Sequence, residues 1–225
     1  MISICQPLLA GQEKEYLVDC LKRNEISSSG SYLEAFGKAF SRYCGARYGI
    51  AVTSGTAALH LGLNALGVKP GDEIIMPSFT IASCAFATIY CGAKPVFVDS
   101  KPDTWNIDPD RIEEKITKKT KAVMPVHIYG YPCDMKRILE IAGKHHLSVI
   151  EDAAEAHGAE VNDHKVGGIG DLGIFSFYGN KIITCGEGGM VVTSNRKIAE
   201  RCSLLKNLAF LETKRFFHKE VGFNY

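Results

Sequence analysis

Apolar positions along the chain follow two alternating patterns, short unbroken runs and helical spacing. Leu59, Leu63 and Leu66 recur at intervals of three and four residues, which predicts a helix over residues 56–66. Gly67 directly follows this stretch and is typical of the left-handed residue that ends a helix. The alternation of strand and helix patterns continues along most of the chain.

The same patterns predict further strands and helices. The predicted strands cover residues 73–76, 95–98, 121–126, 147–150, 172–177 and 189–193, and the predicted helices cover residues 81–91, 109–116 and a segment that starts after Asp134. Strands that alternate with helices predict a mostly parallel sheet covered on both faces, the three-layer α/β class. In such sheets functional groups gather where the strands end.

The composition is typical of a folded globular chain. Of the 225 residues 46% are hydrophobic and 23% are charged, and the formal net charge is +1. This balance excludes wholesale disorder and a nucleic-acid binder that depends on excess Lys and Arg. The apolar runs stay short of the roughly 20 residues that span a membrane, and the N-terminus lacks the pattern of a secretory signal. We therefore expect no nucleic-acid or membrane partner.

Eight cysteines are scattered along the chain without a Cys-x-x-Cys pair. Metal sites and disulfide frameworks need closer spacing in a chain of this size, so we predict neither. Free cysteines are often buried, and Cys84 and Cys91 lie in apolar stretches. We therefore expect reduced, packed thiols in a cytoplasmic protein.

The turn Ser54-Gly55-Thr56-Ala57 enters the first predicted helix. Small residues let backbone N–H groups approach an anion, and a helix N-terminus adds a favourable field, so this turn is a candidate phosphate site. The simpler alternative is that these residues only cap the helix.

Glu151 and Asp152 directly follow the predicted strand 147–150. A buried acid is costly unless something pairs with it. A metal, a ribose hydroxyl or a protonated ring nitrogen would serve as that partner, and the alternative is a cap for the next helix.

Lys181 lies in the apolar and aromatic segment 175–184 and not on a charged face. Desolvation lowers the pKa of a buried lysine and makes its amine nucleophilic, as a Schiff-base lysine requires. The alternative is a loop lysine whose ammonium reaches solvent. The following turn, residues 186–189, permits a tight reversal and is assigned no chemistry.

The turn, the acid and the lysine together fit one cofactor. Pyridoxal 5'-phosphate (PLP) needs an anion site for its phosphate, an acid that keeps its pyridine nitrogen protonated and a lysine for its aldehyde. The chain offers all three in this order.

Five segments resemble the DegT-type family of PLP-dependent sugar-nucleotide aminotransferases. They are SGTAALHLGLNALGVKPGDEIIMPSFT, KPVFVDSKPDTWNIDP, PVHIYGYPCDM, VIEDAAEAHGA and GDLGIFSFYGNKIITCGEGGMVVT. The resemblance covers essentially the whole chain and is strongest to the sugar 4-aminotransferases of the family. It implies the aspartate aminotransferase fold (fold type I). It also implies an enzyme that moves an amino group, usually from glutamate, to a nucleotide-linked keto-deoxysugar for surface polysaccharide or related glycan synthesis.

The resemblance assigns roles to individual residues. Lys181 matches the Schiff-base lysine, and Asp152 matches the acid that pairs with the pyridine nitrogen. The other matches are Gly55, Thr56 and Ala57 in the phosphate-binding turn, Ser176 as a hydroxyl donor to the phosphate, Ala154 against one face of the ring, Glu155 near its phenolic oxygen and Asn224 in a segment that reaches the neighbouring subunit's site. A homodimer with both sites at its interface is therefore implied.

The chain departs from the family pattern at Ile81, where many relatives place an aromatic residue over the cofactor ring. An aliphatic cover still excludes water but gives up a stacking contribution of about 0.5–1.5 kcal/mol. Residues 1–25 are expected to form an N-terminal arm and helix, and residues 26–225 a large PLP-binding domain. Relatives continue beyond the motif Gly-Phe-Asn-Tyr, so we expect the small C-terminal domain to be missing.

Other functions compete with the aminotransferase. A sugar dehydratase of the same fold has histidine in place of the lysine, so Lys181 argues against it. A truncated, non-catalytic PLP-binding remnant or a split subunit is favoured by the end at Tyr225. A Rossmann oxidoreductase is excluded, because no Gly-x-Gly-x-x-Gly follows the first strand.

Overall fold

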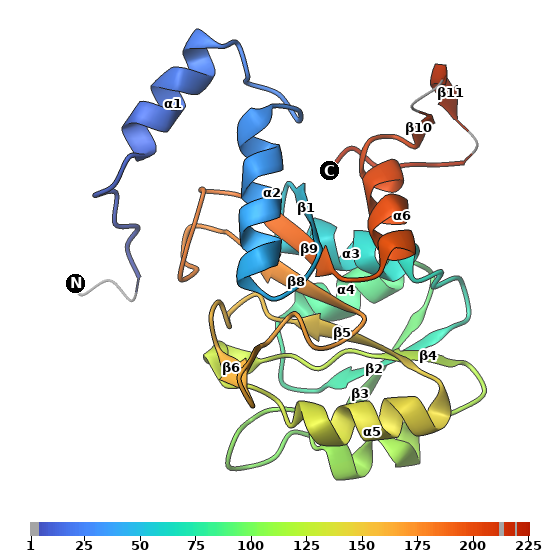
Figure 1. The fold of residues 1–225 in the computed structure, drawn as a ribbon. Helices are drawn as coiled ribbons and strands as arrows, with labels where there is room; N and C mark the ends of the chain where they lie inside the picture. Colours follow the sequence, from blue (N-terminus) through green and yellow to red (C-terminus); the bar gives the residue numbers. More distant parts are fainter. Residues whose placement is uncertain (1–4, 212–213, 219) are drawn as a thin grey trace.

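The computed structural model describes residues 5–211, 214–218 and 220–225. They form a seven-stranded sheet with helices on both faces (Figure 1). The helices are α1 (Glu13–Lys22), α2 (Ser31–Tyr43), α3 (Gly55–Ala65), α4 (Ala82–Tyr90), α5 (Met135–His145) and α6 (Arg196–Lys206), with short 3₁₀ turns η1 (Pro109–Arg111), η2 (Glu113–Lys115) and η3 (Ile128–Gly130).

The main sheet confirms the predicted mostly parallel arrangement. Its strands are β1 (Tyr48–Val52), β2 (Glu73–Pro77), β3 (Lys94–Val98), β4 (Thr120–Val123), β5 (Ser148–Asp152), β8 (Leu172–Ser176) and β9 (Gly189–Thr193). Their order is β1-β9-β8-β5-β4-β2-β3, with parallel pairing from β8 to β3, while β9 runs antiparallel to β8 and β1. Two small ladders pair β6 (Glu160–Val161) with β7 (His164–Lys165) and β10 (Phe210–Leu211) with β11 (Lys214–His218).

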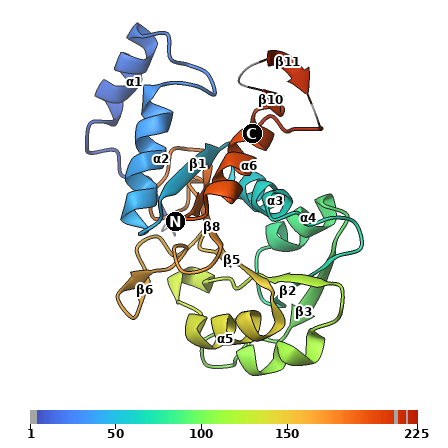
Figure 2. The same ribbon diagram turned by 45° about the vertical axis from the view of Figure 1, so that its right-hand side comes forward.

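Alternating side chains of the strands build the three layers. Ile174 of β8 and Val191 of β9 join the apolar cluster that contains residues of α3, α4 and α6. Their neighbours Phe175 and Met190 point the other way and pack with Phe40 of α2. A third cluster on that second face packs α5 against β2, β4 and β5. Figure 2 shows α3 and α4 on one side of the sheet and α5 on the other.

Three predicted elements differ from the structure. The strand predicted over residues 121–126 is shorter, and as β4 it ends at Val123. Residues 109–116 form the separate turns η1 and η2 and not one helix, although Asp108 caps the first as predicted. Pro109 and Ile112 are buried and Ile116 packs against the same apolar cluster, so the segment makes its apolar contacts from two short turns. Strand β5 extends through Glu151 and Asp152, because both residues continue the ladder with β8.

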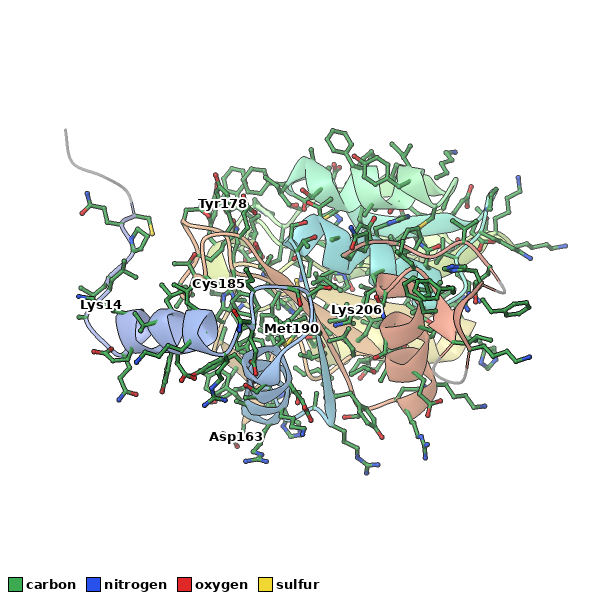
Figure 3. All side chains as sticks on the ribbon, turned by 90° about the horizontal axis from the view of Figure 1, so that it is seen from above. Lys14, Asp163, Tyr178, Cys185, Met190 and Lys206 are labelled. Carbon is green, nitrogen blue, oxygen red and sulfur yellow. The ribbon has the colours of Figure 1, made fainter. Side chains whose placement is uncertain are left out.

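Helix α1 differs from the others because none of its residues is buried. Figure 3 shows Lys14 of α1 at the edge of the molecule, away from Met190 in the sheet. The division into an arm (1–25) and a large domain (26–225) stays a prediction. Residues 1–4 of the arm lie outside the described residues.

The cysteines largely match the packed thiols that the sequence predicts. The buried free thiols are Cys44, Cys84, Cys91, Cys133 and Cys202. Within the described ranges, no group of three or more His, Cys, Asp or Glu side chains is placed to hold a metal ion. Of the helices in the described part of the chain, none is both long and apolar enough to cross a membrane.

Candidate active site

A cavity of about 300 Å³ opens where β1, β2, β5 and β8 end. It lies at the edge of the sheet where functional groups of α/β folds gather. Seven of the predicted site residues line it, namely Gly55, Thr56, Ile81, Asp152, Ala154, Ser176 and Lys181. The structure thus brings together Gly55 and Lys181, which are more than 120 positions apart in the sequence.

The N-terminus of α3 forms one end of the cavity. Ser54 is the N-cap, and its Oγ accepts a hydrogen bond from the amide of Ala57 at 3.1 Å. The first amides of a helix have no acceptor within the helix, so those of Gly55 and Thr56 are oriented for an anion. The cap interpretation is therefore confirmed for Ser54 and Ala57, while the anion site stays a prediction for the amides of Gly55 and Thr56. Ala57 is used by the cap and does not line the cavity.

Three hydroxyl groups accompany these amides. Thr56 Oγ1 donates to Ser83 Oγ at 3.0 Å, and both side chains line the cavity with Ser176. Gly55 is required here, because a Cβ atom at this position would lie 2.9 Å from the Cβ of Ser176. The close approach of α3 to the end of β8 gathers amide and hydroxyl donors in one place.

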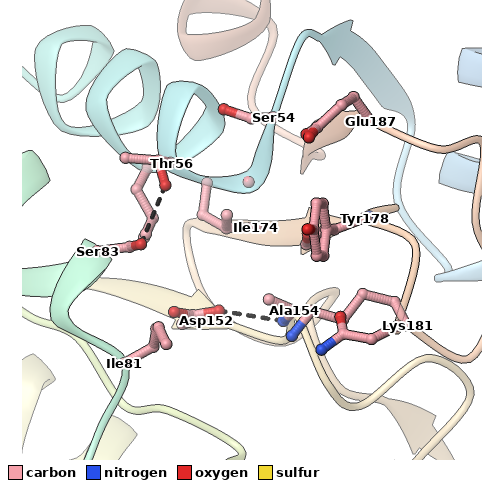
Figure 4. Close-up of a pocket in the computed structure, with 14 residues that line it drawn as sticks. Ser54, Thr56, Ile81, Ser83, Asp152, Ala154, Ile174, Tyr178, Lys181 and Glu187 are labelled. Carbon is pink, nitrogen blue, oxygen red and sulfur yellow. Dashed lines mark hydrogen bonds between the residues drawn. The ribbon is translucent and has the colours of Figure 1, made fainter. Parts of the chain in front are cut away.

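Asp152 lies in the wall of the cavity, drawn between Ile81 and Ala154 in Figure 4. The residue is 2% exposed. Its Oδ1 accepts from the amide of Ala154 at 3.1 Å, and its Oδ2 accepts from Sγ of Cys84 at 3.0 Å. Burial raises the pKa of this carboxyl group, and the two hydrogen bonds oppose that shift.

Glu151, the neighbour of Asp152, points to the opposite face of the sheet. It is fully buried and accepts three hydrogen bonds of 2.6–2.8 Å from amides of the loop 167–170. Nε2 of His127 lies 3.1 Å from the same carboxylate. Nδ1 of His127 accepts from the amide of Cys133, which leaves the proton on Nε2 to donate to Glu151. Glu151 therefore holds a loop, and the cavity uses only Asp152 of the pair.

Lys181 reaches the cavity from the loop that follows β8. Its side chain is 17% exposed, and its Nζ donates to Oε1 of Glu155 at 3.1 Å. Glu155 also accepts from the amide of Tyr129 through Oε2 at 2.9 Å. The lysine is therefore held inside the site by a carboxylate and does not extend from the loop into solvent.

Asn224 is a predicted site residue that lies elsewhere. It forms a bridge with Asn207 at the end of α6. The hydroxyl group of its neighbour Tyr225 lies 2.7 Å from Nδ1 of His60 on α3. Asn224 thus takes no part in the cavity of its own chain, and its role in a neighbouring subunit stays a prediction.

The cavity also contains side chains that the sequence did not single out. Ser83, Tyr178, Asn180 and Glu187 belong to this group. Ser83 sits in the first turn of α4, where a hydroxyl commonly serves as a cap. Glu187 lies in the turn 186–189 that was assigned no chemistry. The sequence signal that could have identified Glu187 as a site residue is its position as an acid between two glycines, next to the loop that carries the lysine.

Comparisons with known proteins agree with this geometry. The chain is 49% identical over 224 residues to the GDP-perosamine synthase of Caulobacter vibrioides, covering 100% of this chain and 60% of that protein. The structure of DesI in the presence of its TDP-sugar product superposes with a TM-score of 0.89 at 33% identity, over 98% of this chain and 55% of that one. NtdA of Bacillus subtilis, solved with bound cofactor PMP, gives a TM-score of 0.85 at 35% identity, over 99% and 53%.

The alignments cover all of this chain but only part of each relative, so the chain spans about three fifths of the length of the curated relatives it matches. A profile of the DegT/DnrJ/EryC1/StrS aminotransferase family matches residues 7–225, nearly the whole chain. The predicted resemblance and the aspartate aminotransferase-like fold are therefore confirmed. The chain belongs to the DegT/DnrJ/EryC1/StrS aminotransferase family.

Proposed function

We propose that the chain binds PLP and forms the cofactor-binding part of an aminotransferase that acts on a nucleotide-linked keto-deoxysugar. One observation carries the proposal. Lys181, Asp152 and the N-terminus of α3 line a single cavity, although they come from a loop, the end of a strand and the start of a helix that are far apart in the sequence.

The donors around the cavity fit PLP group by group. The amides of Gly55 and Thr56 and the hydroxyls of Ser83 and Ser176 suit a phosphate dianion. A carboxylate such as Asp152 suits a protonated ring nitrogen. The apolar walls, formed by Leu59, Ile81, Ala154 and Ile174, suit the faces of a flat aromatic ring.

PLP, when bound, supplies an aldehyde that takes up an amino group and a ring that withdraws electrons. The chain's residues would hold it and manage the protons. Asp152 keeps a proton on the ring nitrogen through its negative charge. Lys181 would hold the aldehyde carbon through Nζ and, when released, would carry a proton between the two carbon atoms on either side of the transferred nitrogen. Glu155 Oε1, at 3.1 Å, is placed to accept the proton that Nζ must lose to act as a nucleophile.

The relatives support the choice of substrate. One is a GDP-perosamine synthase, and another was solved with its TDP-sugar product. We therefore assign a nucleotide-linked keto-deoxysugar as acceptor and glutamate as amino donor, in surface polysaccharide or related glycan synthesis in the cytoplasm.

Helix α1 supports a homodimer. It has no buried residue, and Tyr16, Leu17 and Leu21 are 50%, 66% and 64% exposed. Apolar side chains gathered in this way mark a surface that another chain covers. A partner subunit bound nearby would also explain how Asn224, outside its own cavity, contributes to a site.

The experiment that tests the function has two stages. The chain is first titrated with PLP while its visible absorbance and the adduct trapped by borohydride are measured. It is then incubated with glutamate and a panel of keto-sugar nucleotides, and amino-sugar products are detected by mass spectrometry. Binding with turnover supports the aminotransferase. Binding without turnover supports the alternative, a non-catalytic remnant or split subunit, and absence of binding contradicts both.

A further inference from the structure

Cys84 lies in the first turn of α4 and is fully buried. Its Sγ is 3.0 Å from Oδ2 of Asp152, and Oγ1 of Thr80 is 3.2 Å from the same sulfur. An ionised carboxylate can only accept, so the thiol donates to Asp152 and the Thr80 hydroxyl donates to the sulfur. The thiol keeps its proton, because burial and the Asp152 charge raise its pKa well above the usual value. Cys84 is thus more than the packed core thiol that the sequence predicts.

Two hydrogen bonds determine how the Asp152 carboxylate is turned. Rotation of a carboxylate about its last side-chain bond is broad, so a fixed orientation needs external contacts. Ala154 supplies one contact at Oδ1 and Cys84 supplies the other at Oδ2. Each carboxylate oxygen accepts more than one hydrogen bond, so capacity remains for a group inside the cavity.

The position of Cys84 on α4 links the two ends of the site. The preceding residue, Ser83, accepts from Thr56 at the N-terminus of α3, where the anion would bind. In this single helical turn, Cys84 therefore contacts Asp152, and the adjacent Ser83 contacts the N-terminus of α3. A small shift of this turn would therefore displace both its contact with Asp152 and its contact with Thr56.

We propose that Cys84 is a positioning residue of this site, whose thiol fixes the Asp152 carboxylate toward the cavity and thereby sets the affinity for PLP. The inference rests on the proposed function. It is specific to Cys84. Cys202 is equally buried but lies in α6, so it serves as the matched control.

The test compares Cys84→Ser, Cys84→Val and Cys202→Val in titrations with PLP. Serine keeps a donor, whereas valine fills the volume without one. We expect Cys84→Val to raise the dissociation constant about three- to tenfold, as for loss of one weak hydrogen bond to a charged group. Cys84→Ser and Cys202→Val should stay within about twofold of the unchanged chain. Equal affinity for Cys84→Val, an equal loss for Cys202→Val or a failure of serine to rescue would overturn the proposal.

A second measurement needs no cofactor. Urea unfolding is measured for Cys84→Val, Asp152→Asn and the double variant. We expect Cys84→Val to lower the ratio of folded to unfolded protein about three- to tenfold when Asp152 is present. In the Asp152→Asn background the same substitution should leave this ratio unchanged. Equal losses in both backgrounds would show that the contact has no energetic weight and would overturn the inference. A chain that binds no PLP but keeps this coupling would overturn the proposed function, while the Cys84–Asp152 contact would stand.

Discussion

Nζ of Lys181, which lines the cavity, and Oε1 of Glu155 lie 3.1 Å apart, and the second oxygen of Glu155 accepts from the backbone of Tyr129. The position of the Glu155 carboxylate is therefore also fixed by the backbone, independently of its contact with Lys181. The pair keeps Nζ of Lys181 oriented at the wall of the site. Reaction at Nζ requires that this ion pair give up a proton.

Replacement of this lysine should abolish covalent attachment of PLP. Lys181→Ala removes the amine that lines the cavity, so the visible absorbance of the lysine-bound cofactor and the borohydride-trapped adduct should both disappear. Peptide mass spectrometry of the reduced protein checks the position of the adduct. Lys144→Ala, an exposed lysine paired with Glu113, is the control and should keep the adduct. An adduct that persists on another lysine of Lys181→Ala would show that the assignment is wrong.

Asp152→Asn should separate binding from catalysis. The amide keeps the volume of the carboxyl group but loses the charge that holds a proton on the ring nitrogen. We expect PLP to bind and transamination to fall by about two orders of magnitude or more. Single-turnover kinetics with glutamate measure the loss. Turnover close to that of the unchanged chain would reduce Asp152 to a structural residue of β5.

Glu151→Gln should instead affect stability. The side-chain amide group would place donors against the amides of the loop 167–170, which now donate to a carboxylate. We expect the free energy of unfolding to fall by about 2–3 kcal/mol, as for hydrogen bonds to a charged group. Urea unfolding measures it. The control Glu160→Gln, on a surface ion pair with Lys165, should change by less than about 0.5 kcal/mol.

His157 should make stability depend on pH. Burial near Phe175 and Phe177 lowers the pKa of its ring from 6.5 to about 4. The unfolded chain therefore takes up a proton at a pH where the folded chain does not. Stability is fully present above pH 6.5 and is lost as the pH falls toward 4. Urea unfolding at pH 7 and pH 5 should show a loss of about 1–2 kcal/mol that His157→Phe reduces. Equal pH dependence of both proteins would contradict this origin.

The strand and helix pattern was predictable where local sequence decides it. Strand β9 occupies residues 189–193 as predicted, because a run of buried apolar residues follows a glycine turn. Helix α4 begins after Ile81 and ends near Cys91 as predicted. The membership of the site was also largely predictable, because loops at the ends of parallel strands converge on one edge.

What the sequence could not show depends on contacts between distant segments. Glu151 and Asp152 are adjacent acids, and only the register of β5 with β8 decides which of them faces the cavity. Cys84 is 68 residues from Asp152, and their contact arises from the placement of α4 beside the end of β5. Asp108 and Pro109 form a start typical of a helix, yet residues 109–116 pack against the core as two short turns.

Asn224 offers a test of whether two subunits share a site. It lies beside Asn207 and away from its own cavity, while the resemblance assigns it to the neighbouring subunit's site. If that assignment is right, Asn224→Ala and Lys181→Ala should each be inactive alone. Mixed dimers would then combine an intact lysine from one chain with an intact asparagine from the other.

The variants are unfolded together, refolded and assayed for transamination with glutamate. Random pairing makes half of the dimers mixed, and each mixed dimer has one complete site out of two. Activity should therefore return to about a quarter of the level of the unchanged protein. If Asn224 acted within its own chain, every site in the mixture would lack one of the two residues and no activity would return. Light scattering on the refolded mixture checks that dimers form, and a monomeric mixture with full activity in Asn224→Ala would contradict both the shared site and the homodimer.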